Sequence, residues 1–70
     1  MDIGIKLKQA RQEAGITQKE LAENLGVHQK DISRWENGER TPALETFAKI
    51  CRILEVSADD MLEISRQKDT

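Results

Sequence analysis

The sequence contains only one cysteine, Cys51, and one histidine, His28. A single cysteine cannot form an internal disulfide, and one thiol with one imidazole does not provide the ligand set of a zinc site. We therefore expect no metal ion, no disulfide and no cofactor. A chain this short buries only about 60% of its unfolded surface, so the fold must depend on one compact hydrophobic core.

Residues that favour β-strands are also scarce. The sequence has no tyrosine, one phenylalanine and one tryptophan, and it has no run of alternating β-branched residues. Strands are normally rich in these residue types, so their scarcity argues against a β-sheet. We therefore predict an all-α fold.

Long apolar runs and recognisable catalytic motifs are absent as well. No segment resembles a signal peptide or approaches the roughly 20 apolar residues that cross a bilayer. The sequence has no Ser–His–Asp order, no paired catalytic carboxylates and no glycine-rich phosphate loop. We therefore expect a cytoplasmic protein that makes no membrane contact and is not an enzyme.

Charge is plentiful but almost balanced, with a formal net charge of −2 at pH 7. A net negative charge is unusual for a protein that coats nucleic acid without regard to sequence. Residues 1–34 hold six cations and five anions, whereas residues 35–70 hold five cations and eight anions. The acidic excess lies late in the chain, which leaves the earlier part able to present a locally positive surface.

The first two predicted helices have clear start and stop signals. Asp2 can cap a helix that ends at Gly15, and its apolar positions are Ile3, Leu7, Ala10 and Ala14. Thr17 and Glu20 have the spacing of a capping box, which satisfies two backbone N–H groups at the start of a helix. That second helix ends at Gly26, and its inward positions are Leu21, Ala22 and Leu25. We expect the following residue, Val27, to fill the turn.

Three further helices are predicted in the rest of the chain. The third runs from about His28 to Asn37 and stops at Gly38. The pair Thr41-Pro42 resembles a cap followed by proline at the first helical position, which predicts a fourth helix extending through residue 54. The apolar stripe of this helix comprises Leu44, Phe47, Ala48, Cys51 and Leu54. The run Ser57-Ala58-Asp59-Asp60 resembles another capping box and predicts a short fifth helix that holds Met61 and Leu62.

These signals predict a single compact bundle of five short helices, with one domain over residues 1–64 and a polar, frayed tail over residues 65–70. Helices this short are marginal in isolation, so each must bury its apolar stripe against the others. The predicted core comprises Leu7, Leu21, Ala22, Leu25, Val27, Ile32, Trp35, Leu44, Phe47, Cys51 and Leu54.

The third predicted helix has two different faces. Its polar residues Gln29, Lys30, Ser33, Arg34 and Asn37 fall within an arc of roughly 140° at helical spacing, opposite Ile32 and Trp35. Glutamine can pair with adenine and arginine or lysine with guanine, so this face suits the reading of base edges in the major groove. A merely solvated outer face is the commoner explanation for such a pattern. The short preceding helix and the tight turn between the two favour a helix-turn-helix.

Several interlocked motifs resemble the Cro/CI-type (XRE-like) helix-turn-helix family of bacterial and phage regulators. The matching runs are Ile16 to Ala22, Leu25 to Val27, Ile32 to Gly38, and Pro42. The resemblance covers about residues 3–64. It implies a lambda-repressor-like DNA-binding domain from a bacterium or phage, with double-stranded operator DNA as its partner.

The resemblance also implies roles for individual residues. Gln18 matches a glutamine that binds a DNA phosphate and braces the recognition helix. Positions that face base pairs or flanking phosphates are matched by Gln29, Lys30, Ser33 and Arg34. Asn37 matches a position that holds the sugar-phosphate chain, and Arg40 is expected to add a phosphate contact.

Two residues depart from the family pattern. His28 stands where the family often has a serine or threonine cap, and Glu39 places a carboxylate in a loop expected to approach phosphate. Asp31 adds another anion in the recognition region, where it can complement the helix dipole, by about 0.3–1 kcal/mol, or recognise cytosine. For His28, an ordinary cap or surface role is favoured over a pH sensor or metal ligand.

Other residues have two explanations each. Trp35 is expected to pack in the core rather than stack on bases, and Cys51 to be a small buried residue rather than a redox sensor. Ile5, Ile50 and Ile53 lie off the main apolar stripes, where they can form a dimer contact. Packing against the fifth helix is an equal explanation for Ile50 and Ile53.

Two functions follow from this reading. The first is a transcriptional regulator, expected to be a repressor, that binds an inverted-repeat operator as a homodimer. The second is a protein-interaction module, such as an antitoxin-like or adaptor domain with the same fold, which the negative net charge keeps open. In either case the chain can belong to a longer parent protein with a C-terminal effector domain.

Overall fold

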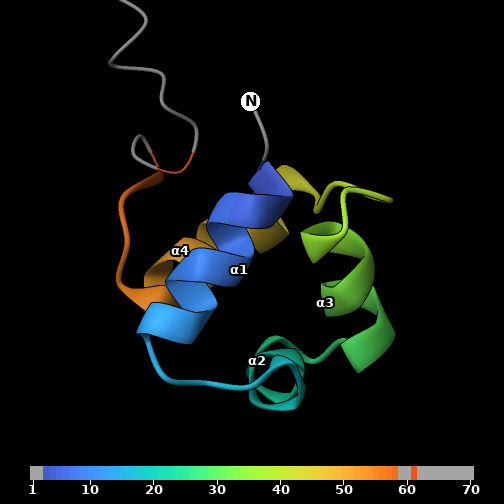
Figure 1. The fold of residues 1–70 in the computed structure, drawn as a ribbon, viewed down its shortest axis with the longest axis horizontal. Coiled ribbons are helices and arrows are strands. Elements are labelled where there is room, and N and C mark those ends of the chain that lie inside the picture. The colour runs from blue at the N-terminus through green and yellow to red at the C-terminus, as the bar shows by residue number, and fades with distance from the viewer. Residues whose placement is uncertain (1–2, 59–60, 62–70) are drawn as a thin grey trace, which may run out of the picture.

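The computed structural model describes residues 3–58 and residue 61. The described part contains four helices: α1 (Ile3–Glu13), α2 (Gln18–Leu25), α3 (Gln29–Glu36) and α4 (Leu44–Leu54). No strand occurs in these residues. In Figure 1, α3 lies to one side of α1 and α2 lies below both; α3 contacts both α1 and α2, and α2 contacts α4. The predicted all-α class is confirmed.

Helix α1 contacts the end of α3 at close range because of a glycine. A Cβ atom at Gly4 would lie 2.6 Å from the carbonyl oxygen of Trp35 and 2.7 Å from that of Glu36. Only a residue without a side chain permits this approach of the two backbones. Ala14, predicted to face inward, is exposed because it follows the last residue of the helix. Asp2, the predicted cap, lies outside the described residues.

The predicted boundaries of α2 and α3 are correct to within a residue. Thr17 Oγ1 accepts from the backbone N–H of Glu20 at 3.0 Å, and Glu20 Oε1 accepts from that of Thr17 at 2.8 Å. This is the predicted capping box. Gly26 ends α2 in a left-handed conformation with φ of 75°, which a residue bearing Cβ adopts at a cost. Helix α3 lies between its caps His28 and Asn37.

Two predictions for α4 are wrong. The helix begins at Leu44, two residues later than predicted, because Pro42 is buried in the preceding loop instead of forming the first helical turn. Leu44 is 80% exposed, whereas Ile50, predicted to lie off the stripe, is fully buried. The buried residues of α4 are Phe47, Ile50, Cys51 and Leu54. This stripe is rotated away from Leu44 and from Ala48, which is also exposed.

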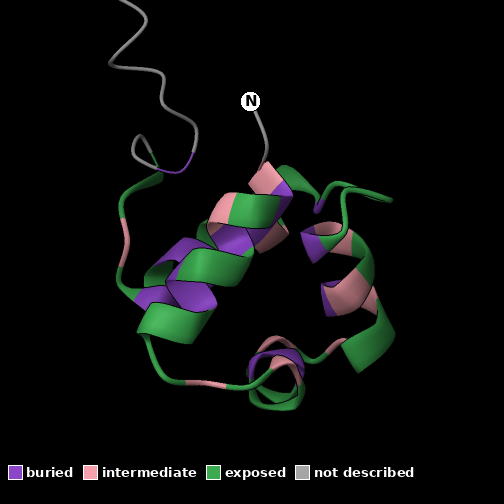
Figure 2. Ribbon diagram, viewed as in Figure 1, coloured by how far each residue is buried: buried purple, intermediate pink, exposed green. Residues whose placement is uncertain are grey.

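The core is built from the inward faces of all four helices (Figure 2). Four side chains are fully buried: Leu7, Leu21, Ile32 and Ile50. Ala22, Phe47, Cys51 and Leu54 are also buried, whereas Leu25, Val27 and Trp35 are half-buried and packed against the core. Ten of the eleven predicted core residues therefore contribute to the core, and Leu44 does not.

The predicted fifth helix is not established. Met61 is buried, and its backbone N–H donates to the carbonyl oxygen of Ser57 at 3.1 Å. Most of this predicted helix and the polar tail over residues 65–70 lie outside the described residues. The described part of the chain therefore supports a bundle of four helices.

The close approach at Gly4 generates a stability prediction. Gly4→Ala would normally stabilise a helix by up to about 1 kcal/mol. Here we expect a loss of about 1–3 kcal/mol in the free energy of unfolding, because the new methyl group meets two backbone carbonyl oxygens that cannot move independently. Urea titration followed by circular dichroism measures this loss. Gln9→Ala, at an exposed position of the same helix, is the control; a Gly4→Ala variant as stable as this control would contradict the proposed contact.

Candidate nucleic-acid interface

Helices α2 and α3 are joined by a three-residue turn, Gly26 to His28, and contact each other. The backbone N–H of Val27 donates to the carbonyl oxygen of Ala22 at 3.0 Å, so the turn is bonded to the helix that precedes it. Val27 is half-buried against the core, where it fills the turn as predicted. Two short helices joined in this way form a helix-turn-helix.

Helix α3 presents a polar face to solvent and an apolar face to the core. Gln29, Lys30, Arg34 and Asn37 are exposed, and Ser33 is half-buried. On the other side Ile32 is fully buried and Trp35 is half-buried against the core. The side-chain amide of Asn37 donates to Ser33 Oγ at 3.4 Å, one turn earlier on the helix. The polar groups therefore extend from a segment that the core holds in place.

A buried ion pair joins α1 to the last turn of α3. Arg11 Nε donates to Glu36 Oε2 at 2.7 Å, and Arg11 Nη2 donates to Glu36 Oε1 at 3.3 Å. Arg11 Nη1 also donates to the carbonyl oxygen of Ile16 at 2.8 Å. The two residues are only 8% and 6% exposed. Because the guanidinium and the carboxylate satisfy each other, neither charge is left unpaired in the interior.

The sequence reasoning missed this ion pair, although a signal was present. Arg11 follows Leu7 by four residues and Glu36 follows Ile32 by four, and both leucine and isoleucine are fully buried. Residues four apart lie on the same face of a helix. An arginine and a glutamate one turn beyond core positions on two helices are therefore candidates for a buried pair.

Gln18 connects the start of α2 to both ends of α3. Its Nε2 donates to Glu36 Oε1 at 2.9 Å, and its Oε1 accepts from Gln29 Nε2 at 3.5 Å. Gln18 is half-buried and Gln29 is exposed. A continuous chain of side chains therefore runs from buried Arg11 to the surface at Gln29.

The loop after α3 is held against the end of that helix. The backbone N–H groups of Glu39 and Arg40 both donate to the carbonyl oxygen of Arg34, at 2.9 Å and 3.3 Å. Arg40 is exposed there, as is Glu39. The cations Lys30, Arg34 and Arg40 thus belong to one segment of the chain, with the carboxylate of Glu39 among them.

The surroundings of Asp31 and Cys51 favour a structural role for each residue. Asp31 Oδ2 accepts from the backbone N–H of His28 at 3.3 Å, so this carboxylate helps to cap α3. Cys51 is buried in the stripe of α4, and burial raises the pKa of its thiol above the ordinary value. Because the thiolate is the reactive form, this environment is unfavourable for a redox sensor.

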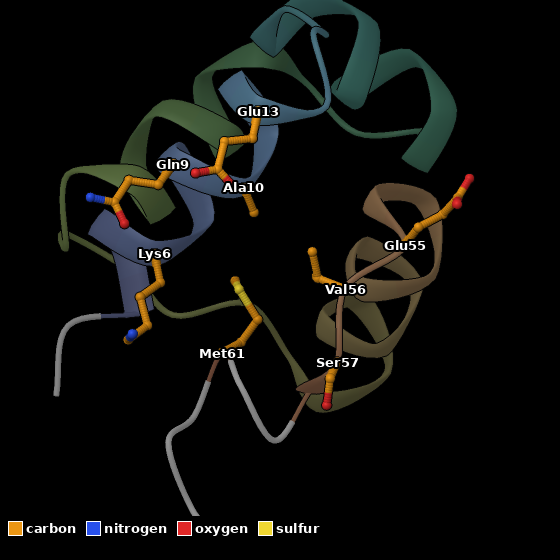
Figure 3. Close-up of a pocket in the computed structure, with 8 residues that line it drawn as sticks. All are labelled: Lys6, Gln9, Ala10, Glu13, Glu55, Val56, Ser57 and Met61. Carbon is orange, nitrogen blue, oxygen red and sulfur yellow. The ribbon is translucent and has the colours of Figure 1, made fainter.

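A separate hollow of about 350 Å³ lies between α1 and the chain that follows α4 (Figure 3). In the close-up the Met61 side chain extends into the space between Ala10 and Val56. The complete lining comprises Lys6, Gln9, Ala10, Glu13, Glu55, Val56, Ser57 and Met61. None of these residues belongs to α2 or α3, so the hollow is not part of the polar face described above.

Comparison with known proteins agrees with this geometry. A family model described as helix-turn-helix matches residues 7–61. The chain therefore belongs to the XRE-type helix-turn-helix family of DNA-binding transcriptional regulators. This is the family that the sequence motifs resemble.

Three bacterial relatives have sequences similar to this chain. The chain is 40% identical over 73 aligned residues to the HTH-type transcriptional regulator ImmR of Bacillus subtilis, and it covers 58% of that protein. It is 37% identical over 62 residues to the HTH-type transcriptional activator BcrR of Enterococcus faecalis, of which it covers 30%. Antitoxin HipB of Escherichia coli K12 is 45% identical over 51 residues. The matches cover 100%, 89% and 73% of this chain.

The chain is thus shorter than the relatives that it matches. It spans 58% of ImmR, 30% of BcrR and 58% of HipB. All three relatives are bacterial, in keeping with the origin that the motifs imply. Within the described residues, no helix is long and apolar enough to cross a membrane.

Because the ion pair is buried, we predict that the free energy of unfolding depends strongly on both partners. Arg11→Met alone leaves Glu36 buried without a counter-charge, so we expect a loss of about 3–5 kcal/mol in the free energy of unfolding. The double variant Arg11→Met/Glu36→Met removes both charges, and we expect it to recover most of that loss. Urea unfolding of the unchanged chain, of the single variants Arg11→Met and Glu36→Met, and of the double variant gives the coupling energy. A loss in the double variant equal to the sum of the two single losses would show that the pair is not coupled.

Proposed function

We propose that this domain binds double-stranded DNA by placing α3 in the major groove, with Gln29, Lys30, Ser33 and Arg34 facing base pairs. The observation that carries the proposal is the polar face of α3, exposed beside Gln18 and supported from behind by the fully buried Ile32. Gln29 can pair with adenine, and Lys30 or Arg34 can pair with guanine.

Gln18, Asn37 and Arg40 are proposed to bind the sugar-phosphate backbone on either side of these bases. Gln18 lies at the first residue of α2, where backbone N–H groups without helical partners favour a phosphate. Asn37 and Arg40 are exposed at the other end of α3. Contacts of this kind position a protein on DNA, whereas base contacts give sequence preference.

The proposed biological role is repression at an inverted-repeat operator. A bound domain can block access of polymerase by occupying the site, whereas activation needs an additional contact with the transcription machinery. The relatives named as a regulator and an activator agree with control of transcription. The chain covers only part of these proteins. Control of transcription by a longer parent chain is therefore also a proposal.

A protein-binding role is the second candidate. It is favoured by the 45% identity to a relative named as an antitoxin and by the net charge of −2. The two roles separate in a selection of bound sequences from random duplex DNA at physiological salt. A repeated half-site supports the repressor, and a chain that enriches no sequence supports the protein-binding module.

We propose that two copies of the domain bind this operator as a symmetric dimer, and that the start of α4 forms the contact between them. Of the large hydrophobic residues that the structure describes, Ile5 and Leu44 are exposed, at 53% and 80%. Leu44 lies beside an apolar hollow of about 200 Å³, lined by Ile3, Thr41, Pro42, Leu44 and Phe47. Ile50 and Ile53 are not available, because Ile50 is fully buried and Ile53 packs against the core.

The position of Leu44 suits this role. It follows the loop that leaves α3, so a two-fold contact at Leu44 would fix the separation of the two copies of α3. Operator half-sites one turn of DNA apart require recognition helices about 34–36 Å apart. An isologous contact uses the same surface on both subunits, so one exposed leucine supplies two apolar contacts.

The base-reading and phosphate-binding residues are expected to give different variant phenotypes. On the selected operator, Gln29→Ala and Arg34→Ala should each cost about 1–3 kcal/mol of binding free energy and relax the preference at one base pair. Arg40→Ala should weaken binding to all sequences alike and lower the salt slope by about one.

Fluorescence anisotropy across a salt series, with selected and scrambled duplexes, measures both effects. Arg52→Ala, an exposed arginine in the last turn of α4, is the control for lost positive charge. Unchanged operator affinity in both Gln29→Ala and Arg34→Ala would exclude these residues from the interface.

The dimer contact is tested with Leu44→Lys. Because Leu44 is 80% exposed, we expect the free energy of unfolding to change by less than about 0.5 kcal/mol. Binding to a complete inverted repeat should lose its cooperativity, while binding to an isolated half-site stays the same. Ile5→Lys is the matched variant on α1. Cooperativity that survives in Leu44→Lys and disappears in Ile5→Lys would move the contact to α1.

A further inference from the structure

We propose that Glu36, buried at the end of α3, determines which base Gln29 accepts at the beginning of that helix. This inference rests on the proposed DNA-binding function and identifies a specificity-determining residue that does not itself touch DNA. The connection between the two ends of α3 is the side-chain amide of Gln18.

The first step is the chemistry of Glu36. Its carboxylate is paired with the guanidinium of Arg11, which is always charged, and it accepts from Arg11 Nε at 2.7 Å. An ionised carboxylate can only accept hydrogen bonds. Any amide that bonds to it must therefore present its NH2 group.

The second step is the orientation of Gln18. Its Nε2 donates to Glu36 Oε1 at 2.9 Å, so the carbonyl oxygen of the same amide is directed away from Glu36. That oxygen, Oε1, is the atom that faces Gln29. The buried carboxylate thus sets the direction of the Gln18 amide, because the opposite orientation would bring two acceptors together.

The third step is the orientation of Gln29, which the Gln18 amide determines at the surface. Gln18 Oε1 can only accept, so Gln29 presents its Nε2 to it, at 3.5 Å. One N–H and the carbonyl oxygen of Gln29 remain available to a ligand. An adjacent donor and acceptor match N7 and the N6 amino group of adenine, whereas guanine offers two acceptors, N7 and O6. The orientation of Gln29 therefore favours adenine over guanine.

Replacing Glu36 by glutamine is expected to reverse the chain of hydrogen bonds. Arg11 takes the new carbonyl oxygen, so the new NH2 group faces Gln18. Gln18 then turns its carbonyl oxygen toward position 36 and its NH2 group toward Gln29. The carbonyl oxygen of Gln29 then accepts from the NH2 group of Gln18, so the NH2 group of Gln29 is available to donate to the two acceptors of guanine.

The test compares the base preferences of four chains by selection from random duplex DNA: the unchanged chain, Glu36→Gln, Gln18→Met and Gln12→Met. The unchanged chain should prefer adenine over guanine at one half-site position by roughly 5- to 150-fold. Glu36→Gln should lower this ratio by about tenfold or more, toward guanine, and leave the other positions unchanged. Gln12→Met, at an exposed position of α1, should behave like the unchanged chain.

Gln18→Met tests the proposal even if Glu36→Gln does not fold. It removes the amide that connects Glu36 to Gln29 and leaves the Arg11–Glu36 pair in place. It should reduce the adenine preference at the same position without creating a guanine preference. An adenine-to-guanine ratio unchanged from the original chain in both variants overturns the proposal. Because Gln18 is also proposed to bind a phosphate, Gln18→Met should in addition weaken binding to all sequences alike. A uniform loss with an unchanged adenine-to-guanine ratio overturns the proposal, because that result shows only a phosphate contact or a structural role.

The orientation of Gln18 is also measurable without DNA. The NMR signals of the Gln18 side-chain NH2 group should shift between the unchanged domain and a folded Glu36→Gln variant, because the hydrogen-bond acceptor of that group changes. Identical signals refute the control of Gln18 by Glu36. An original chain that selects no DNA sequence refutes the proposed function instead, so the two failures are distinguishable.

Discussion

The buried pair of Arg11 and Glu36 is the contact on which the position of α3 depends. It holds the last turn of α3 against α1, close to the point where Gly4 allows the two backbones to approach each other. Each helix has only 8 to 11 residues, a length that is marginal in isolation. A charged pair in the interior requires full mutual hydrogen bonding, so it admits few alternative orientations of α3.

This constraint connects stability to recognition. Arg11 belongs to α1, Gln18 to α2 and Glu36 to α3, so one polar network joins the three helices that form and support the polar face of α3, the proposed DNA-reading surface. Ile32 anchors the centre of α3 in the core while Gln29 and Arg34 remain exposed. A rigid helix loses little conformational entropy on binding, which favours recognition of sequence over general attraction to phosphate. For the proposed function, the net charge of −2 has the same consequence, because it provides little general attraction to phosphate.

Local signals allowed most of the fold to be predicted. The capping box of Thr17 and Glu20 and the glycine after α2 depend on residues only a few positions apart, and both appear where expected. Predictions failed where burial depends on distant elements. Leu44 and Ile50 are both apolar residues of α4, but only contact with the other helices determines that Ile50 is buried and Leu44 is exposed. The polar face of α3 was predictable because Ile32 and Trp35 indicate which side is inward.

The sequence alone therefore determined the helical class and the limits of α2 and α3, because capping, turn formation and helical periodicity act over one or two turns. It also indicated the family, through the motifs that resemble those of its members. The tertiary structure decided the rotation of α4, the close contact at Gly4, and the union of Arg11, Gln18 and Glu36 in one network. Arg11 and Glu36 are 25 residues apart. No local rule links residues at that separation; only the packing of α1 against α3 brings their charges together and makes their burial tolerable.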